Sequence, residues 1–168
     1  IAHGQLYKMH VHWNGGSGER IPAWARRVVQ DEQTHIFSAQ VWQPEKTYAW
    51  SKKKFKPNTS PLLIYECHIG MGQDAEKVGT YTEFKELVLP RIIEDGYNCI
   101  QIMAIQEHPY YGSFGYHVSS FFAASSRFGT PEDLKSLIDE AHKHGVAVIM
   151  DIVHSHAVKN EVEGLGNL

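Results

Sequence analysis

Three side chains that can do chemistry follow an apolar run near the end of the sequence. Residues 146–150 (VAVIM) have the length and composition of a buried strand, and Asp151, His154 and His156 follow closely. A carboxylate and two imidazoles at the end of a strand can bind a metal ion, hold a substrate through hydrogen bonds, or satisfy one another. The spacing alone leaves all three possibilities open.

Two further strands are predicted upstream, and each also ends in polar residues. Residues 62–68 (LLIYECH) and 98–105 (NCIQIMAI) have the pattern of buried strands. His68 ends the first strand, and Glu107 and His108 follow the second. If the three strands are parallel, their carboxyl ends meet at one edge of a sheet, where sites form in such folds. We therefore expect these polar side chains to line a site.

Two predicted helices separate the strands. The first begins at Thr80, where Thr-x-x-Glu forms a capping box, and ends at Gly96, with Pro90 expected to kink or divide it. The second begins after Thr130, with a proline at its first position, and ends at Gly145. Buried strands that alternate with helices are joined by right-handed crossovers, and such connections give a parallel sheet.

The first part of the chain has a different pattern. Residues 5–13 and 35–42 alternate polar and apolar side chains, as half-buried antiparallel strands do, and residues 14–34 between them read as a loop. A small β-rich region therefore precedes the strand-helix repeats. The predicted parts of the chain are residues 1–56, a linker at 57–61, and residues 62–168.

The composition argues against several kinds of partner. The chain has 168 residues, of which 42% are hydrophobic and 21% charged, and a net charge of -3 gives no attraction to nucleic acid or to an anionic membrane. No uninterrupted apolar span approaches the roughly 20 residues of a membrane helix. Cys67 and Cys99 lie in apolar strands and read as buried free thiols, which suits a cytoplasmic location.

Residue type and spacing argue against a metal site and against a serine hydrolase. His154-x-His156 has the form of a zinc pair, but zinc needs three or four ligands, and neither His-Glu-x-x-His nor Cys-x-x-Cys occurs. His10 and His12 form a second such pair, which we expect at the surface. We predict no metal site and no cofactor, and no Gly-x-Ser-x-Gly motif indicates a serine hydrolase. A purely structural role for Asp151 and the histidines stays open.

The loop after the second strand favours carbohydrate. It combines Gly112 and Gly115 with six aromatic side chains: Tyr110, Tyr111, Phe114, Tyr116, Phe121 and Phe122. Aromatic rings stack on the C–H faces of sugars, while carboxylates and imidazoles hydrogen-bond the hydroxyls. Phe121 and Phe122 above all are expected to pack the loop instead, and we assign about half of the six rings to the core.

These residues resemble a known family. The stretch from Gly96 to Asn160 is similar to the glycogen and starch branching enzymes, members of the alpha-amylase family, and especially to the eukaryotic type. The similarity begins near Leu63. Residues 65–71 (YECHIGM) resemble the first barrel strand of the family, and residues 128–142 (FGTPEDLKSLIDEAH) resemble its second helix. The β-rich start resembles the end of the starch-binding β-sandwich that precedes the barrel.

The resemblance implies a fold and a reaction. The expected fold is α/β, a partial TIM (β/α)8 barrel with its first three strands and two helices, preceded by the end of a β-sandwich carbohydrate-binding-like domain. The expected activity belongs to glycogen or starch biosynthesis: an α-1,4 bond is cleaved through a covalent glucosyl-enzyme, and the chain passes to a 6-hydroxyl. The partner is an alpha-glucan such as amylose or glycogen. Another alpha-amylase family glycoside hydrolase, or a non-catalytic glucan-binding fragment, is the alternative.

The resemblance also assigns roles to residues. Asp151 and His156, in DIVHSH, match the family's first signature and are expected to hold hydroxyls of the transferred glucosyl unit, with Tyr116 stacked beneath that sugar. His154 matches a position typical of branching enzymes but receives no role. The nucleophile and acid of the retaining reaction lie on later barrel strands of the family, so we expect both beyond Leu168. The 168 residues alone are therefore expected to be inactive.

Overall fold

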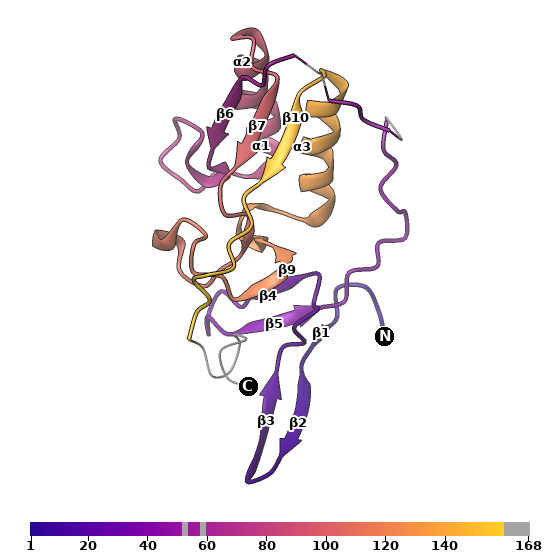
Figure 1. Ribbon diagram of the computed structural model, residues 1–168. Coiled ribbons are helices and arrows are strands. Elements are labelled where there is room, and N and C mark those ends of the chain that lie inside the picture. Colours follow the sequence, from indigo (N-terminus) through magenta and orange to yellow (C-terminus); the bar gives the residue numbers. More distant parts are fainter. Residues whose placement is uncertain (52–53, 58–59, 160–168) are drawn as a thin grey trace. The chain divides into compact units, whose positions relative to one another are not determined.

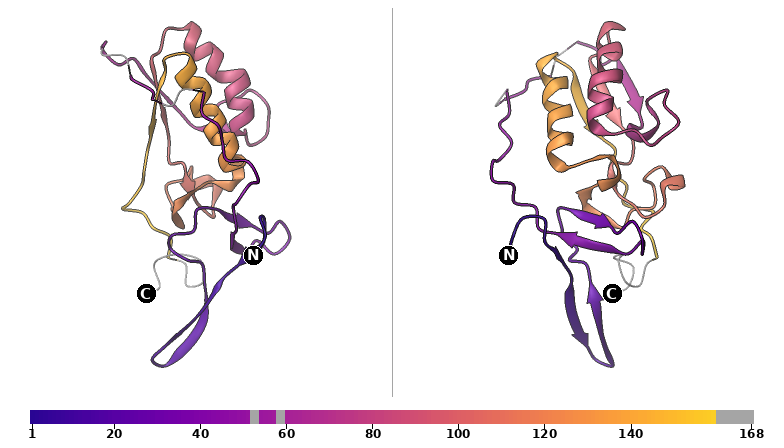
Figure 2. Two further views of the ribbon diagram at one scale, coloured as in Figure 1. Left: turned by 90° about the vertical axis from the view of Figure 1, so that its right-hand side faces the viewer. Right: turned by 180° about the vertical axis from the view of Figure 1, so that it is seen from behind.

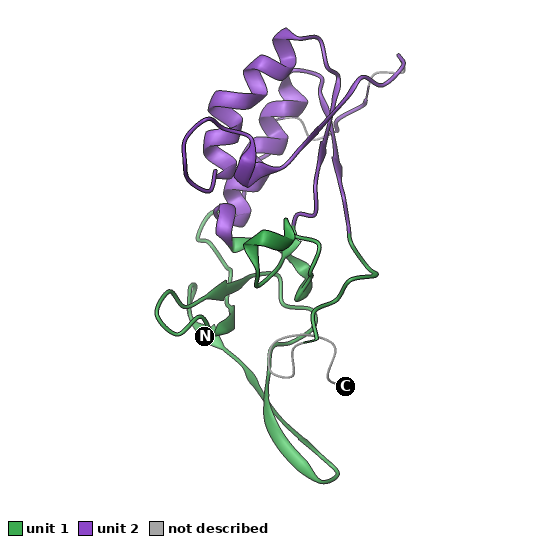
Figure 3. Cartoon of the chain, turned by 90° about the vertical axis from the view of Figure 1, so that its left-hand side faces the viewer, with its two compact units in different colours: residues 1–46, 106–126, 153–168 green, residues 47–105, 127–152 purple. Residues whose placement is uncertain are grey.

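The computed structural model describes residues 1–51, 54–57 and 60–159, and the chain divides into two compact units (Figure 3). The first unit contains residues 1–46, 106–126 and, among the described residues, 153–159. The second contains residues 47–105 and 127–152, apart from residues 52–53 and 58–59. The predicted linker at 57–61 therefore falls partly outside the described residues, and the predicted domain boundaries stay a prediction.

A three-stranded parallel sheet forms the centre of the second unit (Figure 1). Its strands are β6 (Ile64–Cys67), β7 (Cys99–Ile102) and β10 (Ala147–Met150), in the order β10-β7-β6. Ile64 and Ala147 both align with Cys99, so the three strands start level and run the same way. This confirms the predicted parallel arrangement. Figure 2 shows the helices of this unit on one face of the sheet.

The first predicted helix is divided into three pieces. They are α1 (Tyr81–Glu83), the π-helical stretch η2 (Phe84–Val88) and α2 (Leu89–Glu94). The Thr80 hydroxyl accepts a hydrogen bond from Glu83 N at 3.1 Å and the Glu83 carboxylate accepts one from Thr80 N at 3.0 Å, which confirms the capping box. Pro90 lies directly after the π-helical stretch, so the regular α-helical pattern is interrupted next to the proline, as predicted, although residues 81–94 stay helical throughout. Gly96 follows the helix at φ +83°.

The long helix α3 (Pro131–Lys143) follows the sequence prediction closely. Asp133 N donates to the Thr130 hydroxyl at 3.2 Å, and Thr130 N donates to the Asp133 carboxylate at 2.8 Å. Leu137 is fully buried in the middle of the helix. Gly145 lies beyond the last turn at φ +78°, a conformation that favours glycine. Both predicted ends of the helix are confirmed.

Two of the three parallel strands are less buried than their composition suggested. Ile100 in β7 is fully buried, whereas Ile64 in β6 is 43% exposed and Met150 in β10 is 46% exposed. In a sheet ordered β10-β7-β6, only β7 has a neighbour on both sides. The prediction that all three strands are buried is therefore wrong for β6 and β10, because an apolar composition does not show whether a strand is central or at an edge.

Both cysteines are buried free thiols, as predicted. Burial raises the pKa of Cys67 to about 12 and also raises the pKa of Cys99. Both thiols are therefore protonated at neutral pH, and a protonated thiol is a poor nucleophile.

Small antiparallel sheets make up the first unit. They are β1 (Leu6–Tyr7), β5 (Phe37–Gln40) and β4 (Val28–Gln30) in the order β1-β5-β4, the hairpin of β2 (Met9–Trp13) and β3 (Gly16–Arg20), and the pair β8 (Gln106–Glu107) and β9 (Ser120–Ala124). His10 and His12 lie exposed on β2, as expected. Short 3-10 turns complete the chain at η1 (Ile69–Met71), η3 (Tyr111–Ser113) and η4 (Ser126–Phe128).

The prediction of a loop over residues 14–34 was wrong, because β3 and β4 lie within it. Trp13 pairs with Gly16 across the two-residue turn Asn14-Gly15, and Gly15 has φ +94°. Asn-Gly is a strong hairpin signal on its own. The second strand of this hairpin has no pattern in the sequence, because β3 (GSGER) lacks the alternation of apolar residues that marks a half-buried strand.

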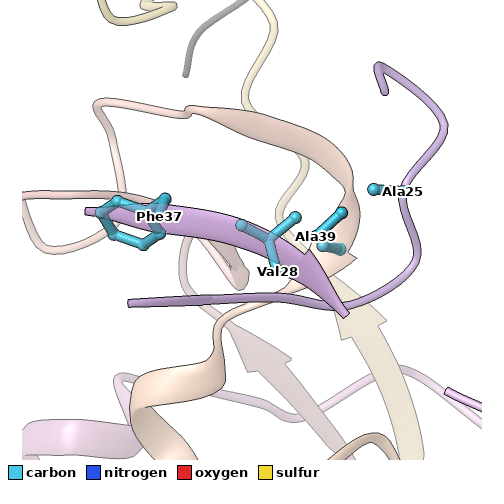
Figure 4. Close-up of a cluster of buried hydrophobic side chains, with 5 residues drawn as sticks. Ala25, Val28, Phe37 and Ala39 are labelled. Carbon is cyan, nitrogen blue, oxygen red and sulfur yellow. The ribbon is translucent and has the colours of Figure 1, made fainter. Parts of the chain in front are cut away.

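A small apolar cluster forms the core of the first unit (Figure 4). Phe37 and Ala39 of β5 are buried while Ser38 and Gln40 between and after them are partly exposed, which confirms the predicted alternation. The cluster consists of Ala25, Val28, Phe37, Ala39 and Ala123, with Ile21 packed against it. Ala123 ties β9 to the sheet of β4 and β5. No helix within the described ranges is long and apolar enough to cross a membrane.

A buried carboxylate on α3 holds the segment around Ser51 in the second unit. The Asp139 carboxylate accepts hydrogen bonds from Tyr48 OH at 3.1 Å, from Ser51 N at 3.1 Å and from Ser51 Oγ at 2.7 Å. Burial alone would raise the pKa of Asp139, but the hydrogen bonds from Ser51 and Tyr48 outweigh it and lower the pKa below the ordinary 3.8. The ionised form is therefore the one that binds the segment.

This contact is expected to weaken in acid. Because the pKa of Asp139 is lower in the folded than in the unfolded state, its stabilising effect is present above the unfolded pKa and is lost as pH falls through the folded pKa. We expect Asp139→Asn to speed hydrogen exchange at the Ser51 amide about tenfold at pH 7, and by a shrinking factor below about pH 4. Glu132→Gln on the same helix serves as control. A factor that is constant from pH 3 to 7 would contradict this account.

Candidate functional site

Asp151 lies at the carboxyl end of the parallel sheet, as predicted. Its backbone N–H donates to Ile102 O at 2.9 Å, so it extends the pairing of β10 with β7 by one residue, and its side chain is partly exposed. His68 follows β6 at the same end of the sheet and is buried. Its ring meets the Phe128 ring edge-to-face, with the ring centroids 5.6 Å apart. A carboxylate thus stands where the loops of such a fold gather functional groups.

Tyr116 and His156 lie on two neighbouring segments of the first unit. Val118 and Ala157 form a parallel bridge, and Val158 N donates to Val118 O at 3.0 Å. Each of the two predicted site residues is therefore within two positions of this bridge. Tyr116 is partly buried and His156 is exposed. Asp151 belongs to the other unit, so the grouping of all three residues in one site remains a prediction.

Glu107 and His108 are buried in the loop rather than exposed on it. The Glu107 carboxylate accepts hydrogen bonds from Ser126 N at 2.6 Å and from His108 N at 3.2 Å, and its carbonyl accepts one from Ser119 N at 2.9 Å. His108 Nδ1 donates to the Gln106 carbonyl at 2.9 Å, which fixes the proton on that nitrogen. These contacts hold the backbone of the loop. The predicted convergence of Glu107 and His108 with Asp151 spans both units and stays a prediction.

The aromatic side chains of the loop are more exposed than predicted. Tyr110 is 65% exposed and Phe122 52%, and none of the six rings is fully buried. The assignment of about half of them to the core is therefore wrong. Among residues 106–123, the buried positions belong instead to small, polar or aliphatic residues: Gln106, Glu107, His108, Gly115, Val118, Ser119, Ser120 and Ala123. Trp24 stacks on Phe122 with ring centroids 4.3 Å apart, so aromatic faces gather at the surface.

Glycines occupy two tight positions of this loop. A Cβ atom on Gly112 would lie 2.4 Å from the Tyr110 hydroxyl, too close for any side chain unless the ring moves. Gly115 follows Phe114, and both residues have positive φ, at +92° and +54°. Such a turn favours glycine because it has no Cβ atom. Tyr110 is 65% exposed and its ring can move, so the shape of the loop depends on glycine mainly at Gly115.

Sequence reasoning missed one residue that joins the two segments. Gln106 is only 3% exposed, and both ends of its carboxamide are hydrogen-bonded, to the loop at Phe121 and to the other segment at Val153. A glutamine in a short polar run gives no sequence signal for burial. Among the residues that the structure describes, no three His, Cys, Asp or Glu side chains come close enough to share a metal ion.

Comparisons with known proteins support the resemblance. The family model described as alpha amylase, catalytic domain, matches residues 91–163. A 1,4-alpha-glucan-branching enzyme of Dictyostelium discoideum is 49% identical over 170 residues, which cover 100% of this chain and 25% of that protein. In Arabidopsis thaliana, 1,4-alpha-glucan-branching enzyme 2-2, chloroplastic/amyloplastic, is 50% identical over 98% of this chain and 21% of that protein.

A solved structure agrees with the family match. A putative alpha amylase from Salmonella typhimurium superimposes with a TM-score of 0.72 at 27% identity, covering 99% of this chain and 26% of that chain. The fold is therefore of the TIM-barrel type. The chain spans about a quarter of the length of the curated relatives that it matches. By its sequence, the chain is related to the 1,4-alpha-glucan-branching enzymes of the alpha-amylase family, as its motifs predicted.

Proposed function

We propose that the protein containing this chain is a 1,4-alpha-glucan branching enzyme. It cleaves α-1,4 bonds in amylose or glycogen and transfers the released chain to a 6-hydroxyl, which forms an α-1,6 branch. The observation that carries the proposal is the 49% identity to an enzyme of that name across the whole chain. The reaction needs no cofactor. The two free buried thiols fit a reducing cytoplasm, where we place the protein.

The two regions of the chain receive separate roles in this proposal. Residues 62–168 supply the opening strands and helices of the catalytic barrel, which is supported by the parallel order β6, β7, β10 with helices between the strands. Residues 1–56 are the end of a β-sandwich that resembles carbohydrate-binding domains, which is supported by the antiparallel pairing of β1, β4 and β5. The glucan is the partner of both regions.

Three residues of this chain are proposed to hold the glucosyl unit that is transferred. The Asp151 carboxylate accepts hydrogen bonds from sugar hydroxyls, His156 bonds a hydroxyl on the same sugar, and the Tyr116 ring stacks on the apolar face of that ring. The position of Asp151 at the end of β10 and the bridge that joins the segments of Tyr116 and His156 support these roles.

The bond-breaking groups belong to other parts of the enzyme in this proposal. A retaining glycoside transfer needs a nucleophilic carboxylate and a carboxylic acid about 5 Å apart. No carboxylate within these 168 residues matches the family signatures of those two groups. This chain therefore contributes binding and orientation of the sugar ring, which strengthen as the ring distorts toward its oxocarbenium-like transition state.

Branching can be separated from its nearest alternatives by two assays on one reaction. The full-length protein is incubated with amylose while iodine staining and reducing ends are followed. A branching enzyme lowers the stain without a net gain of reducing ends, because each cleaved chain is rejoined. A hydrolase of the alpha-amylase family raises the reducing ends as the stain falls. A non-catalytic glucan-binding protein changes neither.

The 168 residues alone are expected to show no activity on amylose. Without the nucleophile and the acid, the covalent glucosyl intermediate cannot form. The same iodine and reducing-end assays check this on the purified 168-residue chain, with the full-length protein as the positive control. Loss of stain or new reducing ends with the pure chain would show that a catalytic pair lies within it.

A further inference from the structure

One buried carboxamide joins two segments of the first unit that are distant in the sequence. Gln106 Nε2 donates to Phe121 O at 3.0 Å, and Gln106 Oε1 accepts from Val153 N at 2.8 Å. The first bond reaches β9, in the aromatic loop, and the second reaches the stretch that leads to His156. Because a carboxamide has one donor end and one acceptor end, a single side chain satisfies a carbonyl and an N–H at once.

Two further contacts hold the same segments together. The rings of Phe121 and His154 are parallel within 11°, with centroids 6.1 Å apart. Beyond them, Val118 and Ala157 form the parallel bridge. The stretch from Val153 to Val158 is therefore attached to the loop at three successive points, and His156 lies between the second and the third.

The contact made by Gln106 differs from the other two in its surroundings. His154 is exposed, and Val158, which donates the hydrogen bond of the bridge to Val118 O, is only half-buried, so water competes more readily for these two contacts. Gln106 is 3% exposed, so no water replaces its two hydrogen bonds when they break. A buried N–H left without a partner costs more than a bond exchanged for water. The buried carboxamide is therefore the contact that sets the register between the two segments.

We propose that Gln106 is a positioning residue for the glucan site. Its carboxamide fixes the segment that carries His156 against the loop that carries Tyr116, so that both residues meet the same sugar. This inference rests on the proposed function, because the register matters to catalysis only if these residues act on a glucan. Gln106 itself touches no substrate and acts through the segment after Val153.

The test is a double-mutant cycle in the full-length enzyme. Gln106→Met keeps the size of the side chain and removes both hydrogen bonds, and we expect it to lower kcat about tenfold with KM for amylose nearly unchanged. If Gln106 acts through His156, then Gln106→Met lowers kcat less than about twofold in a His156→Ala background, because the positioned group is already gone. Equal factors in both backgrounds would indicate a general structural effect and overturn the proposal.

A matched control comes from the same unit. Gln40 on β5 is partly buried, and its Nε2 donates a hydrogen bond to Gly4 O at 3.1 Å, outside both segments. Gln40→Met is expected to leave kcat within about twofold of wild type. If Gln40→Met lowers kcat as much as Gln106→Met does, the effect does not come from the register of the two segments.

A second variant, Gln106→Glu, keeps the proposal testable if Gln106→Met fails to fold. An ionised carboxylate accepts from Val153 N but cannot donate to Phe121 O, whereas a protonated carboxyl does both. Activity relative to wild type should therefore rise as pH falls, and burial places this change at higher pH than for an exposed glutamate. Taking the ratio to wild type at each pH cancels the titration of the nearby groups on the packed elements: Glu107, His108 and His154. A flat ratio would contradict the positioning role.

Hydrogen exchange separates failure of this inference from failure of the proposed function. In Gln106→Met, the Val153 amide should exchange about tenfold faster, whatever the enzyme does to glucan. If the wild-type protein forms no branches, the proposed function fails even when Val153 loses protection. If branching occurs but Val153 keeps its protection in Gln106→Met, only the positioning role fails.

Discussion

Replacing Asp151 with alanine in the full-length enzyme is expected to lower kcat for amylose by one to two orders of magnitude while KM changes little. A hydrogen bond from a sugar hydroxyl to a carboxylate contributes about 1.5 to 3 kcal/mol, which corresponds to roughly one to two decades in rate. Long glucans bind at many other subsites, so the loss falls on the distorted ring in the transition state rather than on ground-state binding. Initial rates over a range of amylose concentrations measure both constants.

Asp95→Ala provides the control, because Asp95 is an exposed carboxylate that follows α2 in the same unit. It should leave both constants unchanged. If Asp151→Ala raises KM and leaves kcat unchanged, Asp151 binds the resting glucan and not its transition state.

The zinc alternative predicts a different result: stoichiometric metal in the purified enzyme that disappears in both His154→Ala and His156→Ala. Elemental analysis distinguishes the two accounts.

Replacing Phe37 with alanine is expected to destabilise the first unit by about 3 to 5 kcal/mol. Phe37 is 2% exposed and is the largest member of the apolar cluster with Val28, Ala39 and Ala123. The neighbours are small, so they cannot fill the space that the ring leaves, and a cavity remains. Native-state hydrogen exchange at the amides of β4 and β5 measures the free energy of opening in the full-length protein.

Phe122→Ala is the matched control, because Phe122 is 52% exposed and its ring stacks on Trp24 at the surface. Its loss should cost about 1 kcal/mol or less. If both variants lower the free energy of opening equally, the cluster around Phe37 is not what stabilises β4 and β5.

Signals that act within a few residues predicted the fold well. Thr80 forms the capping box that its sequence indicates, Thr130 caps α3 as predicted, and Gly145 ends α3 in the left-handed conformation. These features succeed because their hydrogen bonds join residues three or four positions apart. The exposure of β6 and β10 could not be predicted from such local patterns. Whether an apolar strand is central or at an edge depends on the neighbours that the whole sheet provides.

The candidate site shows the same division. Asp151 lies at the end of β10, where the motif placed it, and Tyr116 and His156 lie on segments joined by a bridge. The role of Gln106 was not predicted, because its two hydrogen bonds reach residues 15 and 47 positions away. The exposure of the aromatic rings in the loop was not predicted for a related reason. Polar residues fill the interior of that loop, and composition alone assigns such positions to the surface.

Counting α-1,6 linkages by proton NMR tests the central claim most directly. Amylose is incubated with the full-length protein, and the anomeric signals of α-1,4 and α-1,6 glucosyl units are integrated over time. The proposed function predicts that α-1,6 signals grow as α-1,4 signals fall by the same amount, and that Asp151→Ala slows this exchange by one to two orders of magnitude. Loss of α-1,4 signal with growth only of reducing-end signals, or no change with well-folded protein, would contradict it.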